Sequence, residues 1–114
     1  MRIGEFSKLH GISSDTIRYY LDMELLVTEK QSGQYKFKKS DSKDLKRIIE
    51  LKELHFSLID IQKILTLQRL SGTNTTQFRK LYISFLEKKQ KEVTIELSKY
   101  EKIDGSLTEK IKQL

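Results

Sequence analysis

The sequence predicts a mostly α-helical protein that contains one small β-hairpin and ends in one long helix. Three observations predict this fold class. The 114 residues include no proline and only five glycines, so few positions interrupt a helix. Apolar residues recur every three or four positions over much of the chain, which is the spacing of one helix face. Between residues 35 and 38 this spacing gives way to the alternation that is typical of a strand.

Two short helices joined by a glycine turn are predicted at the N-terminus. The first covers about residues 4–10 and the second about residues 14–22. Gly11 can adopt the left-handed conformation that ends a helix, and Ser13 is a residue type that caps the start of the next one. Such a pair of helices is a helix-turn-helix unit.

A hairpin, or wing, is predicted next, with arms near residues 25–27 and 35–38. The second arm alternates aromatic residues with lysines. Lys36 and Lys38 therefore share one face, opposite the aromatic side chains.

Two further helices are predicted from capping signals. Asp41, with Asp44 three residues later, is expected to cap a third helix. Ser57 and Asp60 repeat this signal for a fourth helix. The third helix is expected to bury an apolar stripe made of Leu45, Ile48, Ile49 and Leu54.

One long helix is predicted over about residues 75–103, which corresponds to a length of about 43 Å. Its apolar residues approximate the seam of a coiled coil, interrupted by Lys89. We expect Gly105 to end this helix and Ser106 to start a short final one. The seam comprises Phe78, Leu81, Tyr82, Phe85, Leu86, Val93, Leu97, Tyr100 and Ile103.

The expected organisation is a winged helix-turn-helix domain at 1–73, a coiled-coil helix at 74–104 and a short C-terminal helix at 105–114. The sequence leaves open whether it is complete or the N-terminal part of a longer protein.

The composition argues against several classes of function. With no cysteine, the chain offers neither disulfides nor thiolate chemistry, and its two histidines, His10 and His55, lack neighbours at metal-ligand spacing. No phosphate-binding loop or nucleophile motif stands out, so we expect no enzyme and no cofactor. No signal peptide or membrane span is apparent, and a cytoplasmic protein is expected.

The net charge of +6 is concentrated in one segment. Residues 30–47 hold seven basic residues against two acidic ones. This favours an anionic partner such as nucleic acid, although a solvated charged face is the alternative.

Several motifs in register resemble the MerR family of transcriptional regulators over about residues 1–67. They are RIGEFSK at 2–8, GIS at 11–13, TIRYY at 16–20, LL at 25–26, the wing at 33–37, DL at 44–45 and FSLxxI from 56 to 61. The chain departs from the family pattern at Leu21, which is usually acidic, and at Glu24 and His55, which are usually glycine.

The resemblance implies that the second helix reads DNA in the major groove. It places Arg18 and Tyr19 at the phosphate backbone, and Ser14, Asp15 and Thr16 nearest the base edges. Two alternatives remain open: Tyr20 contacts DNA or belongs to the core, and Asp15 reads a base or only complements the helix dipole.

The resemblance also implies backbone contacts outside the second helix. Lys36 and Lys38 suit phosphate contact from the wing, while Tyr35 either contacts DNA or pins the wing to the body. Lys52 in the third helix either faces the DNA backbone or is a solvated lysine.

The function implied by the resemblance is that of a homodimer that binds a palindromic promoter site and distorts it for RNA polymerase. The expected dimer seam is formed by Tyr82, Leu86, Val93, Leu97 and Tyr100. The alternative is a protein–protein interaction module, in which the long helix docks on a partner and the winged unit is a scaffold.

Overall fold

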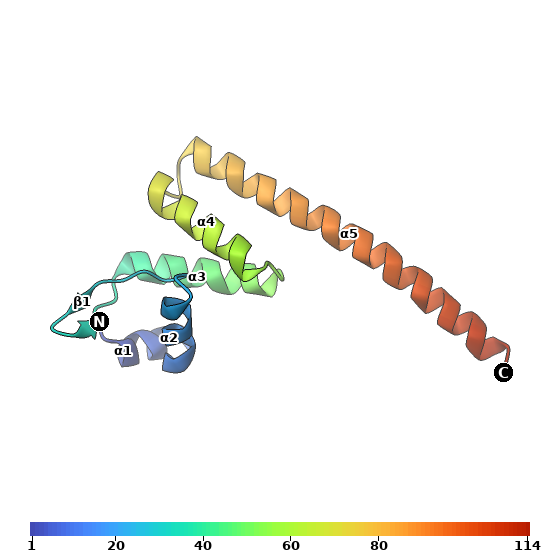
Figure 1. The fold of residues 1–114 in the computed structure, drawn as a ribbon, viewed down its shortest axis with the longest axis horizontal. Coiled ribbons are helices and arrows are strands. Elements are labelled where there is room, and N and C mark those ends of the chain that lie inside the picture. Colours follow the sequence, from blue (N-terminus) through green and yellow to red (C-terminus); the bar gives the residue numbers. More distant parts are fainter. The chain divides into compact units, whose positions relative to one another are not determined.

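The computed structural model describes residues 1–114, which form two compact units, Met1–Gly72 and Thr73–Leu114. The predicted fold class is confirmed: the chain is mostly helical, with one small hairpin and one long C-terminal helix (Figure 1). The elements are α1 Ile3–His10, α2 Ser14–Asp22, β1 Lys30–Gln31, β2 Gln34–Tyr35, α3 Lys39–Glu53, α4 Leu58–Ser71 and α5 Thr76–Lys112.

The helix-turn-helix formed by α1 and α2 is built by the predicted local signals. Gly11 ends α1 in the left-handed region, with φ 63° and ψ 30°. The Ser13 hydroxyl accepts a hydrogen bond of 3.1 Å from the backbone N–H of Thr16, which satisfies one of the free donors at the start of α2.

The two positions where the resemblance expects glycine both lie in the left-handed backbone region. Glu24 follows the end of α2 with φ 59°, and His55 follows the end of α3 with φ 62°. Their N–H groups donate back to Leu21 O at 3.1 Å and Lys52 O at 3.0 Å. The chain therefore keeps the turn that a glycine makes, at a conformational cost of about 1 kcal/mol for each side chain.

The wing is a shorter hairpin than its sequence predicts. Its ladder contains only two pairs, Lys30 with Tyr35 and Gln31 with Gln34, and the first predicted arm at 25–27 is not a strand. Ser32 and Gly33 both have positive φ, as a tight hairpin turn of this type requires.

The core of the first unit lies between its four helices, and α3 packs against α4. Leu54 was expected in the α3 stripe but is 46% exposed, because α3 ends at Glu53; Leu51, one turn after Ile48, is buried instead. The core consists of Phe6, Ile17, Tyr20, Leu25, Leu26, Phe37, Leu45, Ile48, Leu51, Phe56, Ile61, Ile64 and Leu65.

The start of α3 corrects a second prediction. The helix begins at Lys39 rather than after Asp41. Asp41 lies within the first turn, and its carboxylate accepts a hydrogen bond of 2.7 Å from the backbone N–H of Lys38. A carboxylate at this position reaches back to the residue that precedes the helix, so Asp41 supports the cap without being the cap residue. The signal from Ser57 and Asp60 is confirmed, with 3.1 Å between the Ser57 hydroxyl and the Asp60 N–H.

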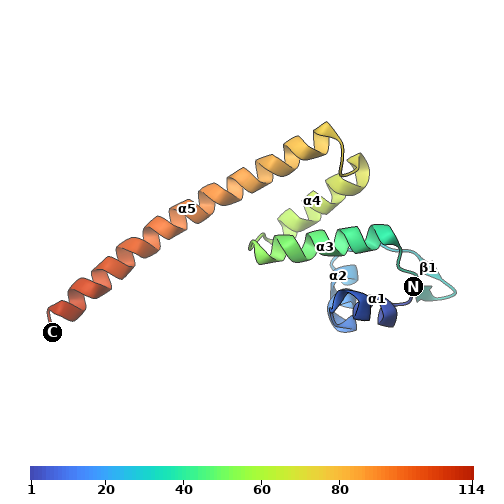
Figure 2. The same cartoon turned by 180° about the vertical axis from the view of Figure 1, so that it is seen from behind.

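The predicted break at Gly105 is wrong, and α5 continues to Lys112 (Figure 2). A glycine inside a helix costs only about 1 kcal/mol relative to alanine, which does not end a helix with good formers on both sides. The hydroxyls that were expected to cap a new helix bond within the old one. Ser106 donates to Lys102 O at 3.0 Å, and Thr108 donates to Asp104 O at 3.1 Å. No helix combines the length and the apolar character needed to cross a membrane.

Candidate nucleic-acid interface

The exposed face of α2 carries an ion pair formed by two of the predicted site residues. Arg18 Nη1 lies 3.0 Å from Asp15 Oδ1, and the two side chains are 56% and 96% exposed. An exposed pair of this kind contributes little to stability. It holds the guanidinium on the surface, where the N–H groups of Arg18 can exchange the Asp15 carboxylate for a phosphate as their acceptor.

The start of α2 places two further predicted residues, Ser14 and Thr16, at the surface in half-buried positions. The Thr16 hydroxyl lies 2.8 Å from the Ser13 hydroxyl, next to the N-terminal end of the helix. Short hydroxyl side chains at the start of a recognition helix are small enough to approach base edges.

The two tyrosines at the end of the motif are placed differently. Tyr19 is 43% exposed, whereas Tyr20 is 4% exposed and belongs to the core. The Lys52 ammonium lies 5.3 Å from the centre of the Tyr20 ring, in a cation–π contact between α3 and α2. Of the two alternatives for Tyr20, its burial favours the core.

The wing presents its polar residues outward, as its alternation predicts. Phe37 is buried and Tyr35 is half-buried, while Lys36 and Lys38 are exposed. Lys38 Nζ lies 3.6 Å from a Glu29 carboxylate oxygen. The Lys30 ammonium lies 4.8 Å from the centre of the Tyr35 ring, which gives this ring one cationic neighbour.

One concavity is bordered by α1, α2 and the wing. Its volume is about 610 Å³, and it is lined by Arg18 of α2 and by Gly33, Gln34 and Tyr35 of the wing. The rest of its lining is Arg2, Ile3, Gly4, Glu5 and Lys8, of which Arg2 and Lys8 are basic residues that were not predicted as site residues. Arg2 and Lys8 could not be predicted as neighbours of Arg18 and the wing, because they are far from both in sequence. Only the packing of α1 beside α2 brings these residues together.

Two ionisable groups near α3 have shifted pKa values. Burial raises the pKa of Asp44 above its ordinary range, against the opposing effect of the neighbouring Arg69 guanidinium. Burial lowers the pKa of His10, and the positive charge of Lys46 lowers it further. The His10 ring nitrogen Nε2 lies 2.9 Å from the Ser42 hydroxyl, so the imidazole joins α1 to α3.

The predicted dimer-seam residues all lie on α5. Val93, Leu97 and Tyr100 are 52%, 58% and 62% exposed. Tyr82 stacks on Phe78 one turn earlier, with ring centres 5.6 Å apart, and Leu86 lies one turn after Tyr82. A helix face this apolar and this exposed is incompletely covered within a single chain.

The chain matches the model of a family described as "MerR HTH family regulatory protein" over residues 1–68. It is 29% identical over 108 residues to the HTH-type transcriptional regulator ZntR of Escherichia coli strain K12, covering 93% of this chain and 74% of that protein. The same figures hold for ZntR of E. coli O157:H7.

A third relative is an uncharacterized HTH-type transcriptional regulator of Pseudomonas aeruginosa, which is 38% identical over 69 residues. That match covers 59% of this chain and 52% of the relative. The role named for these relatives, transcriptional regulation, is not an enzymatic one. With more than half of its residues matched by the family model, the chain belongs to the MerR family of helix-turn-helix proteins and is a DNA-binding transcriptional regulator.

Proposed function

We propose that the protein binds a palindromic promoter site as a homodimer and distorts the DNA between the two half-sites. The observation that carries this proposal is the concavity shared by Arg18 of α2 and residues Gly33, Gln34 and Tyr35 of the wing. Since both elements border the same open surface, one duplex can engage the recognition helix and the wing together.

Within each protomer we assign phosphate contacts to Arg18 and Tyr19 and base-edge contacts to the start of α2, where Ser14, Asp15 and Thr16 lie. Lys36 and Lys38 contact the backbone from the wing, with Tyr35 beside them. Lys52 contributes from α3 while its ammonium stays over the Tyr20 ring. Tyr20 supports this surface from the core.

Two copies of α5, packed antiparallel, form the dimer through Tyr82, Leu86, Val93, Leu97 and Tyr100. The twofold axis relates two recognition helices, which matches a palindromic site. Bending or untwisting the DNA between the half-sites changes the relative position of promoter elements, and RNA polymerase is the partner that responds to this change.

A mobility-shift assay with duplexes selected from a random library tests the proposal. A dimeric protein is expected to recover sequences with twofold symmetry, and its affinity is expected to fall steeply as salt rises. Circular-permutation bending assays then measure the distortion. If the full chain binds no duplex even at low salt, the α5 surface serves a protein partner instead.

The change Arg18→Ala is expected to weaken binding to the selected duplex by on the order of tenfold, because a charge-assisted contact is lost. The slope of log affinity against log salt is expected to fall by about one for each protomer bound. Lys91→Ala, which removes one charge from α5, is the control and leaves both quantities unchanged. An unaltered salt slope in Arg18→Ala excludes the phosphate contact.

The change Lys36→Glu is expected to weaken binding to the same duplex by more than about tenfold at low salt, because it reverses a charge that faces the DNA backbone. The side chain is exposed, so the free energy of unfolding is expected to stay within about 0.5 kcal/mol of wild type. Lys36→Arg, which keeps the charge, retains binding. Equal affinities for the two variants indicate that Lys36 is a solvated surface lysine that does not contact DNA.

A further inference from the structure

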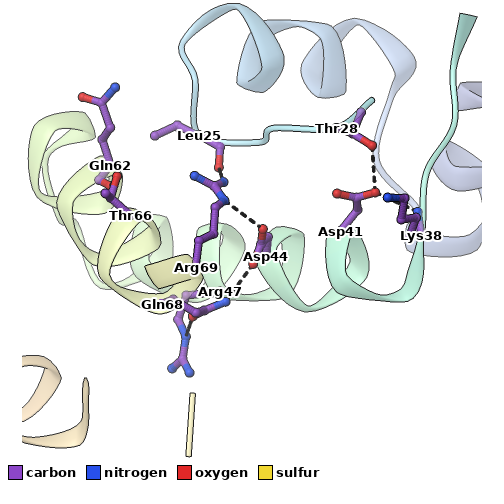
Figure 3. Close-up of polar contacts among 10 residues, drawn as sticks. All are labelled: Leu25, Thr28, Lys38, Asp41, Asp44, Arg47, Gln62, Thr66, Gln68 and Arg69. Atoms are coloured by element: carbon purple, nitrogen blue, oxygen red, sulfur yellow. Dashed lines mark hydrogen bonds and ion pairs between the residues drawn. The ribbon is translucent and has the colours of Figure 1, made fainter. Parts of the chain in front are cut away.

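The chain segments that lead into β1 and out of β2, here called the legs of the wing, are both hydrogen-bonded to a single carboxylate oxygen of α3. Asp41 Oδ2 lies 2.9 Å from the Thr28 hydroxyl, before β1, and accepts a hydrogen bond of 2.7 Å from Lys38 N–H, after β2 (Figure 3). The Thr28 hydroxyl also lies 3.1 Å from Lys36 O, so its one proton is shared between the carboxylate and the opposite leg. Asp41 is only 4% exposed.

A second carboxylate, one turn further along α3, holds the end of the recognition helix. Asp44 Oδ2 accepts a bond of 3.2 Å from Arg69 Nε, and the same guanidinium donates from Nη2 to Leu25 O (Figure 3). Asp44 Oδ1 accepts a bond of 2.8 Å from Gln68 Nε2. The N–H of Leu25 in turn donates to Tyr20 O at 2.9 Å, in the last turns of α2.

The wing is a short structure, so its position depends on the contacts at its root. A ladder of two residue pairs is marginal by itself. The wing tip borders the concavity of about 610 Å³, which Arg18 lines from α2 and which residues 2–5 and Lys8 line from the α1 side. The placement of the tip is therefore determined at the root of the wing. There Phe37 packs in the core and exchanges two backbone hydrogen bonds with Met1, of 2.8 and 2.9 Å, and Asp41 binds both legs.

The geometry points to Asp41 and Asp44, with Thr28 and Arg69, as a clasp that sets the position of the wing relative to the recognition helix. This inference rests on the proposed function, since the clasp matters when both elements engage one duplex. The four residues act as positioning residues and contact no DNA. Asp41 and Thr28 place the wing, and Asp44 and Arg69 place the end of α2.

Double-mutant cycles on the full chain test this assignment, with the duplex enriched from a random library as the probe. Thr28→Val keeps the shape of the side chain and removes its hydroxyl. The loss caused by Lys36→Ala, about tenfold in wild type at low salt, is expected to shrink to about threefold or less in the Thr28→Val background. The loss caused by Arg18→Ala is expected to stay the same in both backgrounds.

Arg69→Lys is expected to give the opposite pattern. Lysine keeps the positive charge beside Asp44 but lacks the planar fork that reaches Asp44 and Leu25 O together. The Arg18→Ala loss shrinks in this background and the Lys36→Ala loss is retained. A variant that is merely less stable, yet folded in the assay, has no reason to spare one contact and weaken the other.

Thr28→Ser, which retains the hydroxyl, is the matched control. In this background the affinity losses caused by Lys36→Ala and Arg18→Ala are expected to equal those in wild type. Far-UV circular dichroism under the binding conditions establishes that each variant is folded. If Thr28→Val is unfolded, the Arg69→Lys cycles decide. Losses that multiply independently in every background overturn the clasp while leaving the proposed function intact. A wild-type chain that binds no duplex overturns both.

Discussion

The double variant Val93→Asp, Leu97→Asp is expected to be a monomer that no longer binds a palindromic duplex tightly. The α5 helix contains 37 residues and so extends about 55 Å. Val93 and Leu97 lie one turn apart on its apolar face and are each more than half exposed in the single chain. Burying one such side chain contributes about 1.5–3 kcal/mol, which a partner helix would supply in the proposed dimer.

Two aspartates at these positions are expected to oppose dimerisation for two reasons. They remove apolar area from the seam, and the twofold arrangement brings four carboxylates into an interface with low polarity, where unpaired charges are strongly disfavoured. Each released protomer then holds a single half-site. We expect the loss in affinity for a palindrome to be on the order of a thousandfold, since the second contact is no longer intramolecular.

Sedimentation equilibrium at micromolar concentration measures the first effect and a mobility shift measures the second. Thr94→Asp, Ser98→Asp is the matched control, with the same two charges at the same spacing on exposed positions away from the seam. This control is expected to remain a dimer. If the wild type sediments as a monomer, or if the double variant dimerises normally, α5 is not the dimer helix.

The elements that could be predicted from the sequence are those fixed by contacts within a few residues. Ser13 and Ser57 each cap a helix through the N–H three residues ahead, and Gly11 supplies its own left-handed turn. These contacts form wherever the local chain is helical, so the residue type alone indicates them. The alternation from Tyr35 to Lys38 is equally local, because successive side chains of an extended segment point to opposite faces, even though β2 itself ends at Tyr35.

The features that the sequence did not reveal depend on residues far away along the chain. Asp44 has the spacing of a capping residue, yet its partners Gln68 and Arg69 lie 24 and 25 positions later. The burial of Tyr20 depends on the packing of α2 in the core, and no local pattern separates it from Tyr19. Gly105 illustrates the opposite error, since a weak local signal is overridden by the helix formers on both sides.

Phe37→Ala is expected to have the largest effect on stability, because one aromatic ring attaches the wing to the body. Phe37 is 4% exposed and stacks on Phe6 with ring centres 4.3 Å apart and planes inclined by 11°. Phe6 also packs edge-on against His10 at 4.7 Å. Replacing a buried phenylalanine with alanine costs about 3–5 kcal/mol, since apolar contact is lost and a cavity remains.

This loss is a large part of the stability of the first unit. A domain of about 70 residues is stable by roughly 4–11 kcal/mol, so Phe37→Ala removes from about a third of that free energy to nearly all of it. Urea denaturation followed by far-UV circular dichroism measures the change. All variants are compared at one fixed protein concentration, because the proposed dimerisation would add to the apparent stability. Phe37→Leu keeps most of the buried volume and is expected to lose less than about 1.5 kcal/mol. If Phe37→Ala loses no more than Phe37→Leu, the stacked ring does not anchor the wing, and its position depends on the hydrogen bonds of Asp41 and on those between Met1 and the Phe37 backbone.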